Sequence, residues 1–458
     1  MHRSSSRSKQ RRTCIEDLPD DVLFIIMSKL SVNVKECFRA SLISKRWLSL
    51  PTCLSEITFD GTIARGSGGY SGDLFIERAN KFLEQYGKPG SRWMPLSVFR
   101  ISFYLYKNCV TDINNWIGFA LSNGVRVLDV VLRPGYVRRE NLRWTMYDHY
   151  LYVFPCDLLN KTHIALERLL LVSCVFGRNL NTKLTSLKEV ELWATHVTEA
   201  DTLNIATYCT SLTKLTFDFC ILPERLIVGG SSLTYLRVEC CEDVREIELS
   251  DGRALMCFSY QGMSVKFIKF CEAPQLTHVR FGMCDCDDFF MDDLYVPKVL
   301  LRDFPAMKSL VLSRFCDTLH SPSFEPGAFC KLEVLHLVYE GSSTFSLLSV
   351  LKLLRACPVV RSFEMVPPFR CEVGKDENVR LPIQAFHNSL KTVEIREFTC
   401  SKEEVKLVSM IIQASAALDQ VTIICLRKGH KEFQGIQKMK LAKTIFLKMM
   451  QGRTLIFS

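Results

Sequence analysis

The sequence predicts a protein of the α/β class, in which a short helical module precedes a solenoid of repeats, with parallel strands on one face and helices and loops outside. Two observations predict this fold. From residue 166 onwards, short apolar segments recur, at intervals such as 21 residues from Leu166 to Leu187 and 28 residues from Leu332 to Val360, and each alternates as a strand does. The first 50 residues instead contain two segments with helical periodicity and no strand pattern.

Length and composition fit a large core and an intracellular chain. The chain has 458 residues, of which 48% are hydrophobic. No apolar run approaches the roughly 18 residues of a membrane span, so no membrane association is expected. The basic start, MHRSSSRSKQRRT, is followed by no apolar leader. The 20 cysteines are therefore expected to be reduced thiols, and the location to be cytoplasmic and/or nuclear.

Basic residues at the two ends account for much of the net charge of +9. Residues 1–14 are expected to form a disordered basic tail. The alternative is a nuclear import signal made by Arg3, Arg7, Lys9, Arg11 and Arg12. No basic face with aromatic partners is apparent, so a nucleic-acid partner is not expected.

The first helix-like segment, IEDLPDDVLFIIMSKL, is apolar around most of its circumference. Pro19 suits the first helical position, and Asp20 and Asp21 place negative charge at the positive end of the helix dipole. The run from Val22 to Met27 is entirely apolar, whereas a helix that packs on one core needs only a stripe. A second buried surface is therefore expected, in this chain or in a partner.

A second helix-like segment, VKECFRASLISKRWLSL, completes a module of about 40 residues, which is near the limit for independent folding. The LPDD start and the pattern R-x-S-x-x-S-K-R-W, from Arg39 to Trp47, resemble the F-box in the form common in plants. The resemblance covers residues 15–59. Ser31 departs from it, because many F-boxes have proline at this position.

The resemblance to an F-box implies a partner. F-boxes bind the Skp-type adaptor of a cullin–RING ubiquitin ligase, and their first helices give one face to that adaptor. Roughly half of the matching residues are expected to pack inside the module instead, because a helix surface divides between core and interface. Trp47 suits either role. The adaptor-binding candidates are Leu18, Pro19, Val22, Leu23, Ile26, Leu42, Ser44 and Trp47.

Residues 60–97 are expected to form a linker and one helix. GTIARGSGGYSGD is rich in glycine and serine, as flexible loops are. The helix follows in DLFIERANKFLEQYG, with Asp73 as N-cap and Gly87 just beyond its end. Another helix is expected in TDINNWIGFALSNG, up to Gly124.

Residues 98–385 are expected to form leucine-rich repeats. LERLLLVSC, which begins at Leu166, fits the pattern L-x-x-L-x-L-x-x-C at every position. LTKLTFDFC, LTYLRVECC and LTHVRFGMC, which begin at Leu212, Leu233 and Leu276, fit with conservative changes, and LMCFSYQG keeps only the first half. The pattern places several cysteines at strand ends, where a small side chain can turn inward, namely Cys174, Cys220, Cys241 and Cys284.

Alternation along these strands separates a core side from a binding side. In LTKLTFDFC, Leu215 and Phe217 are expected to be buried, whereas Thr216 is expected to face solvent on the inner, concave side. Matching positions of the other copies are expected beside it in parallel register. The target-binding candidates are therefore Thr216, Asp218, Arg237, Glu239 and Arg280.

Residues 386–458 resemble the FBD region that closes many plant F-box/LRR proteins. Within it, Ser401 and Glu404 match a capping box at the start of a helix. The last helix, at about residues 434–450, carries apolar residues on one side and lysines on others. A cap over the final repeat is preferred to a membrane-binding or calmodulin-binding role.

No sequence motif predicts catalysis or a cofactor. The chain contains no H-E-x-x-H, G-x-x-x-x-G-K-[ST] or G-x-S-x-G motif. CDCDDFFMDD, from Cys284 to Asp293, combines thiols and carboxylates but lacks the spaced pairs of a zinc site. An acidic loop is the preferred interpretation, with a divalent-ion site as the alternative.

The F-box resemblance and the repeats together imply a non-catalytic substrate-recognition subunit of an SCF-type (Skp–cullin–F-box) E3 ubiquitin ligase. In this hypothesis the F-box binds the adaptor, and through it the cullin and RING subunits. The repeats hold an unknown protein target near a ubiquitin-loaded enzyme. The alternative is an interaction scaffold or ligand receptor that does not assemble into an active ligase.

Overall fold

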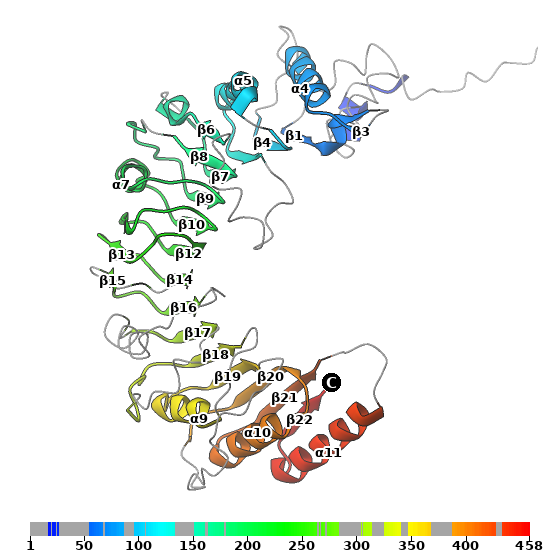
Figure 1. Ribbon diagram of the computed structural model, residues 1–458, viewed down its shortest axis with the longest axis vertical. Helices are drawn as coiled ribbons and strands as arrows, with labels where there is room; N and C mark the ends of the chain where they lie inside the picture. The colour runs from blue at the N-terminus through cyan, green and yellow to red at the C-terminus, as the bar shows by residue number, and fades with distance from the viewer. Residues whose placement is uncertain are drawn as a thin grey trace, which may run out of the picture. The chain divides into compact units, whose positions relative to one another are not determined.

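The computed structural model forms two compact units, Met1–Thr195 and His196–Ser458, and each is described by itself (Figure 1). The described residues are 17–19, 21–23, 25–26, 55–66, 69–86, 96–105, 107–132, 151–160, 164–177, 180–262, 265, 267–270, 273–283, 304, 306–313, 325–339, 347–367, 387–426 and 433–458.

Parallel strands, with helices in the connections, form the first unit. The elements described are β1 Glu56–Asp60, η3 Gly61–Ala64, β2 Arg65–Gly66, β3 Gly69–Tyr70, α4 Gly72–Tyr86, β4 Val98–Ser102, η4 Lys107–Cys109, α5 Val110–Ser122, β5 Val127–Val131, β6 Tyr152–Phe154, η5 Cys156–Asn160, β7 Arg168–Val172, β8 Cys174–Phe176 and β9 Glu189–Trp193. The main sheet pairs in the order β1–β4–β5–β7–β9, so each repeat adds one strand. β6 and β8 pair separately and in parallel.

The second unit has the same architecture. The elements described are α7 Glu199–Tyr208, β10 Lys214–Asp218, β11 Arg225–Val228, β12 Tyr235–Cys241, β13 Glu246–Leu249, β14 Cys257–Gly262, β15 Phe267–Phe270, β16 His278–Met283, β17 Ser309–Ser313, β18 Val334–Val338, α9 Leu347–Ala356, β19 Ser362–Val366, β20 Thr392–Phe398, α10 Lys402–Ala414, β21 Gln420–Cys425, α11 Phe433–Met450 and β22 Thr454–Phe457. Its main sheet runs β10–β12–β14–β16–β17–β18–β19–β20–β21–β22, and β11–β13–β15 form a second parallel sheet. The predicted α/β repeat solenoid is confirmed.

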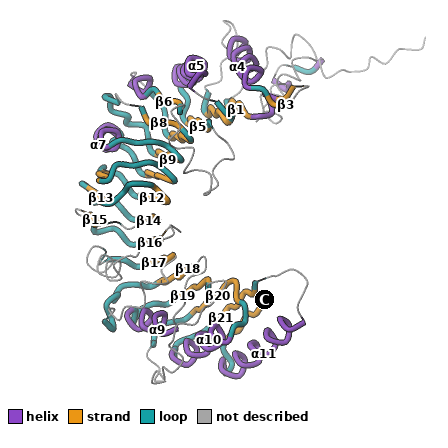
Figure 2. Tube along the Cα trace, viewed as in Figure 1, coloured by secondary structure: helices purple, strands orange, loops and turns teal. Residues whose placement is uncertain are grey.

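Helices occur where the repeats are longest. Figure 2 shows loops and short strands on the side opposite the main sheet at β12 to β16, and helices on that side at β19 to β21. After its main-sheet strand β18, the 28-residue interval from Leu332 to Val360 contains α9, whereas the 21-residue interval from Leu212 to Leu233 contains only the short strand β11 after β10. Longer repeats therefore have room for a helix on the side opposite the sheet.

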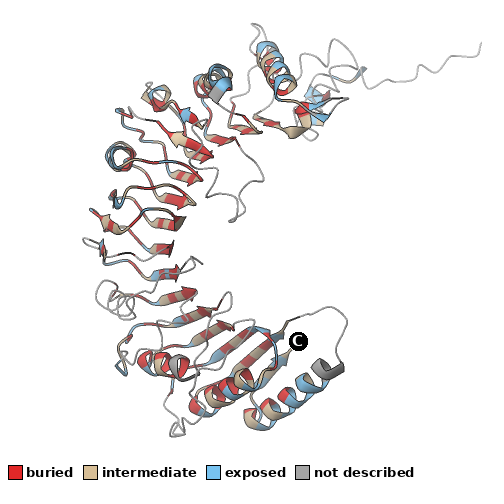
Figure 3. Ribbon diagram, in the orientation of Figure 1, coloured by how far each residue is buried: buried red, intermediate tan, exposed pale blue. Residues whose placement is uncertain are grey.

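Alternating side chains of the strands build the core (Figure 3). Leu215, Leu236 and Phe258 occupy one row across β10, β12 and β14, and each is at most 2% exposed. Burying an aliphatic or aromatic side chain of this size stabilises the fold by about 1.5–3 kcal/mol. The stack of repeats is thus stabilised mainly by rows of leucine and phenylalanine that run across the strands.

A repeated left-handed residue ends several strands. Its positive φ turns the next side chain away from solvent. Cys241 illustrates the result, because its Sγ donates to the carbonyl oxygen of Glu239 at 3.3 Å. Cys220 makes the equivalent contact with Asp218 at 3.5 Å. The positive-φ residues that precede an inward side chain are Ser173, Ala194, Phe219 and Cys240, and the inward residues are Cys174, Thr195, Cys220 and Cys241. The predicted inward turn is confirmed for the three described cysteines; Cys284 lies outside the described residues.

Helix starts follow local chemistry. Ser401 Oγ accepts from the Glu404 N–H at 3.1 Å, and the Glu404 carboxylate accepts from the Ser401 N–H at 3.0 Å, which confirms the predicted capping box of α10. The predicted N-cap of α4 is wrong. Ser71 Oγ accepts from the Leu74 N–H at 3.4 Å, so the helix begins before Asp73.

The last helix covers the end of the second unit. Phe446 on α11 is fully buried and packs against Phe398 of β20 and Phe457 of β22. This packing is the one expected of a cap over the final strands. Among the described helices, α11 included, none is long and apolar enough to span a membrane.

Candidate functional site

The side of each main sheet that points away from the core is called the strand face. In the second unit the predicted register is confirmed: Thr216 pairs with Arg237, and Asp218 with Glu239. Arg280 lies in the same row as Arg237, with Ser259 of β14 between them. Leu215 and Phe217 point the other way and are buried, as predicted.

The prediction that Thr216 faces solvent is wrong. Thr216 is only 3% exposed, and its Oγ1 is buried without a hydrogen-bond partner. A threonine is short, and its register partner Arg237 carries a longer side chain on the same face of the sheet. Glu239 is also largely buried, at 8% exposed. These two target-binding candidates therefore offer little surface to a partner.

Asp218, Arg237 and Glu239 form a charged network across β10 and β12. Arg237 Nη2 lies 3.4 Å from Asp218 and forms a closer ion pair with Glu239. Ser259 Oγ donates to the other oxygen of Glu239 at 2.8 Å. Burial acts to lower the pKa of Arg237, but the two carboxylates outweigh it and raise that pKa. The positive charge of Arg237 is therefore neutralised within the chain.

Arg280 differs from the other charged candidates. Its side chain is exposed at the centre of the strand face. Within the described part of the chain, no hydrogen bond or ion pair joins its guanidinium to another residue. Its neighbours across the sheet, Ser259 and Val311, carry no charge. Of the five target-binding candidates, Arg280 is therefore the cation that is not neutralised by described residues.

The strand face of the first unit carries a charge ladder that the sequence did not reveal. Arg100 of β4 bonds to Asp129 of β5 at 2.8 Å and lies 3.9 Å from Glu56 of β1. Arg168 of β7 reaches Asp129 at 3.4 Å and two carboxylates of β9 at 3.7 Å. Acidic and basic side chains thus alternate from strand to strand. No single stretch of sequence contains this pattern, because each pair is more than twenty residues apart in the chain.

A second network lies near the C-terminal end of the strand face. Glu364 of β19 is 3.6 Å from His336 of β18 and 2.9 Å from Arg396 of β20. Arg396 also bonds to Glu394 at 2.7 Å. Burial lowers the pKa of His336, and the nearby Glu364 carboxylate partly offsets that effect.

The opening helix is described only in part. The Val22 and Leu23 N–H groups donate to the Pro19 carbonyl, so Pro19 stands just before the first turn, whereas the sequence predicted it within that turn. Pro19 and Val22 are exposed, Leu18 and Ile26 are half-buried, and Leu23 is fully buried. Ile25, which was not among the candidates, is 55% exposed. Leu42, Ser44 and Trp47 lie outside the described residues.

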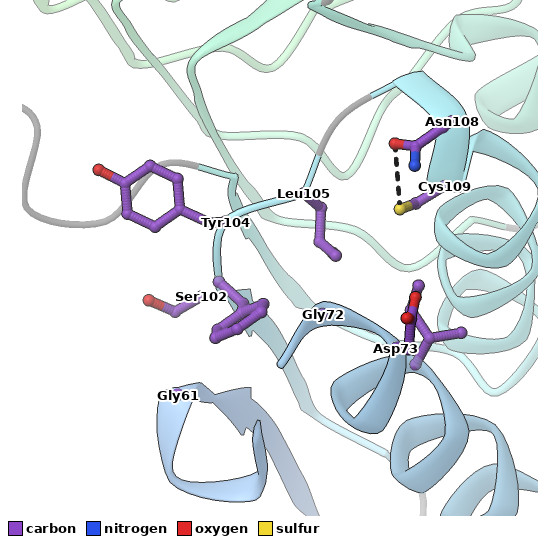
Figure 4. Close-up of a pocket in the computed structure, with 10 residues that line it drawn as sticks. Gly61, Gly72, Asp73, Ser102, Tyr104, Leu105, Asn108 and Cys109 are labelled. Carbon is purple, nitrogen blue, oxygen red and sulfur yellow. Dashed lines mark hydrogen bonds between the residues drawn. The ribbon is translucent and has the colours of Figure 1, made fainter. Parts of the chain in front are cut away.

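A pocket of about 620 Å³ lies in the first unit, at the carboxyl ends of β1 and β4 (Figure 4). Asp73, Ser102 and Asn108 supply polar groups, and Phe103 and Leu105 supply apolar walls. The Cys109 thiol at its edge donates to the Asn108 side-chain oxygen at 3.4 Å. In the part of the chain with described coordinates, no three His, Cys, Asp or Glu side chains are grouped as metal ligands. Residues 284–293 lie outside it.

Comparison with known proteins identifies the repeats. The chain is 22% identical over 448 residues to the F-box/FBD/LRR-repeat protein At3g14710 of Arabidopsis thaliana, across 91% of this chain and 90% of that protein. This similarity supports an F-box/LRR-type plant protein. Residues 91–452 match the family described as At1g61320/AtMIF1, LRR domain. Because the match covers far more than half of its length and the fold is a parallel repeat solenoid, the chain belongs to the At1g61320/AtMIF1 LRR-domain family.

Proposed function

We propose that this chain is the substrate-recognition subunit of an SCF-type E3 ubiquitin ligase and has no catalytic residues of its own. The observation that carries the proposal is the combination, in one chain, of an F-box-like segment at residues 15–59 with the repeats of the matched family. The name of the Arabidopsis relative, F-box/FBD/LRR-repeat protein, contains the same combination. The F-box binds the Skp-type adaptor, and the strand face holds a protein target.

The remaining parts of the proposal follow from the same resemblance. Residues 386–458 are assigned as an FBD-like region, in which the repeats end under the α11 cap. The subunit acts in the cytoplasm and/or nucleus and needs no cofactor. It binds neither membranes nor nucleic acid. It accelerates ubiquitin transfer by proximity, because it holds the target's lysines near an enzyme that other subunits supply.

The exposed apolar residues of the opening helix are the part of the F-box best suited to meet the adaptor. Val22 is 39% exposed and Pro19 is exposed on the same turn, whereas Leu23 is fully buried. Transferring an exposed methyl or methylene group into an interface contributes about 0.8 kcal/mol. Leu23 is therefore assigned to the core of the module, and Pro19 and Val22 to the interface.

Co-purification tests the proposal. Tagged full-length chain is expected to capture the Skp-type adaptor and the cullin, and the double variant Pro19→Ala, Val22→Glu is expected to lose both while its thermal melt is unchanged. Val153→Glu, at a side chain 53% exposed on β6, is the matched control and should bind normally. If wild type captures the adaptor without the cullin, or captures neither, the chain is a scaffold or receptor and not a ligase subunit.

A further inference from the structure

We propose that Arg280 is the anchor of the strand face and binds a carboxylate of the target, so that the target docks through an acidic residue flanked by apolar side chains. The inference rests on the target-binding role of the strand face proposed above and names the chemistry of that target.

The three arginines on the strand face of the second unit differ in their partners. Arg237 pairs with Asp218 and Glu239, and Arg396 lies 2.9 Å from Glu364 and 2.7 Å from Glu394. Arg280 is exposed and has no such partner among the residues that the structure places. Two of the three guanidinium groups are therefore paired within the fold, and the third is exposed and has no partner among the described residues.

The described residues next to Arg280 on the sheet carry no carboxylate that could neutralise it. Ser259 and Val311 flank it on the neighbouring strands, and His278 and Gly282 flank it along β16. Among the residues of the described strands, the nearest carboxylate on this face is that of Glu239. It lies two strands away, which is about 10 Å at the usual spacing between strands. Glu239 already accepts from Ser259 and pairs with Arg237. Among the described residues, the exposed charge of Arg280 therefore lies above a neutral part of the sheet.

The electrostatics of His336 agree with this picture. His336 lies two strands from Arg280 in the same row. Burial is the main cause of its lowered pKa, and the positive charges of Arg396 and Arg280 act in the same direction. His336 is therefore mostly neutral near pH 7 and does not compete with Arg280 for the anion.

Apolar side chains lie next to the proposed anchor. Val311 of β17 is directly beside Arg280 and half-buried. Val334 of β18 is one strand further, and its side chain is 40% exposed. Val338, at the other end of β18, is half-buried. A target segment with an acidic residue over Arg280 would place its neighbouring side chains on these valines.

A carboxylate fits this anchor better than a phosphate group. Phosphate carries close to two negative charges near neutral pH, and proteins usually bind it with several cationic groups. Here a single guanidinium is flanked by neutral residues on the two neighbouring strands, β14 and β17. A guanidinium and a carboxylate match in charge and in their paired hydrogen-bonding geometry. The proposed occupant is therefore an Asp or Glu side chain of a protein target.

Selection of peptides on the purified full-length chain tests the proposal while the target itself is still unidentified. A random peptide library displayed on phage is selected on wild type, and the enriched peptides are synthesised with either their acidic residue or its amide. We expect the enriched peptides to contain an acidic residue next to apolar residues. Arg280→Gln should raise the dissociation constant of these peptides by about tenfold or more, because a charge-assisted hydrogen bond is lost. On wild type, the amide peptides should bind more weakly than the acidic peptides by the same factor. On Arg280→Gln, the amide and acidic peptides should bind with equal affinity.

Two further variants complete the test. Arg280→Lys should retain part of the affinity, because the positive charge remains. Arg253→Gln, at an exposed arginine 2.8 Å from Asp251, is the matched control and should bind like wild type. The proposal is overturned if no peptide is enriched, if enriched peptides lack acidic residues, or if Arg280→Gln binds them normally. The assay contains no adaptor, so a failure here and a failure to capture the adaptor are separate results.

Discussion

The Asp129 carboxylate accepts a hydrogen bond of 2.8 Å from the Arg100 Nε on the neighbouring strand. Asp129 is 6% exposed and also lies 3.4 Å from Arg168, so one buried carboxylate joins two arginines on either side of β5. Ion pairs that bridge adjacent strands of a repeat array connect one repeat to the next. The strand face of the first unit is therefore preorganised by its own charges.

Asp129→Asn is expected to lower the free energy of unfolding by about 1–3 kcal/mol, because both arginines lose a charged partner while the side-chain shape is preserved. Denaturant titration of the purified chain measures the effect. Glu167→Gln is the control, since its partners Arg126 and Lys188 are more than half exposed, and it should cost no more than about 1 kcal/mol. Equal losses in the two variants would show that Asp129 does not bridge the strands.

Much of the fold could be predicted from the sequence, because the repeat pattern is local. The spacing of Leu212, Leu215 and Phe217 sets both the strand and its buried side, and the capping box at Ser401 needs only four residues. The charge ladder could not be predicted in this way. Arg100 and Asp129 are 29 residues apart, and their contact depends on which strands are neighbours and in what register.

The candidate site shows the same limit. Alternation correctly placed Thr216 on the strand face, but it did not show that Thr216 is buried there. Likewise, Arg237 and Arg280 occupy the same repeat position, and only the structure shows that Arg237 is paired with two carboxylates whereas Arg280 has no partner among the described residues. Sequence position identified the surface, whereas the availability of each charge depends on neighbours distant in the chain.

The buried hydroxyl of Thr216 provides a second stability test. Its Oγ1 has no hydrogen-bond partner, so Thr216→Val should raise the free energy of unfolding by about 0.5–2 kcal/mol. Thr195 is the matched control, because it is also buried but its Oγ1 donates to the Trp193 carbonyl at 2.9 Å. Thr195→Val should instead destabilise the chain by about 1 kcal/mol. Chemical unfolding of both variants measures whether each substitution raises or lowers the free energy of unfolding. If Thr216→Val lowers it, the Thr216 hydroxyl makes a hydrogen bond in solution.

Thiols are expected to have a structural role. Burial raises the pKa of the Cys209 thiol to about 12, and it also raises the pKa of Cys357, so neither is a thiolate near neutral pH. Metal binding requires the thiolate. Chelator is therefore expected to leave the thermal melt unchanged, and elemental analysis to find no stoichiometric metal in the purified chain. About one zinc ion per chain would contradict this expectation and favour the divalent-ion interpretation of residues 284–293.

His387 connects two repeats through its ring. It is 1% exposed, its Nε2 lies 2.9 Å from the Cys357 carbonyl after α9, and its Nδ1 accepts from the Leu390 N–H at 3.2 Å. The backbone adds to this connection, because the His387 N–H donates to the Ala414 carbonyl at the end of α10. One ring nitrogen must donate and the other must accept, so the ring fits this position only when neutral.

This geometry predicts a loss of stability in mild acid. Burial lowers the pKa of His387 below its usual 6.5, although the hydrogen bond to Cys357 partly opposes the shift. The unfolded chain therefore binds more protons than the folded chain below pH 6.5. The contribution of His387 is fully present above that pH and decreases as pH falls towards the folded-state pKa, with a slope of at most about 1.4 kcal/mol per pH unit.

The variant His387→Gln isolates this contribution, because glutamine keeps a donor and an acceptor but cannot titrate. Free energies of unfolding measured from about pH 7.5 to about pH 5 should therefore fall more steeply for wild type than for His387→Gln, whatever the offset between the two curves. His336, whose pKa is also lowered by burial, titrates in both proteins and cancels from the comparison. Parallel curves across this range would show that His387 is not held neutral by the contacts to Cys357 and Leu390.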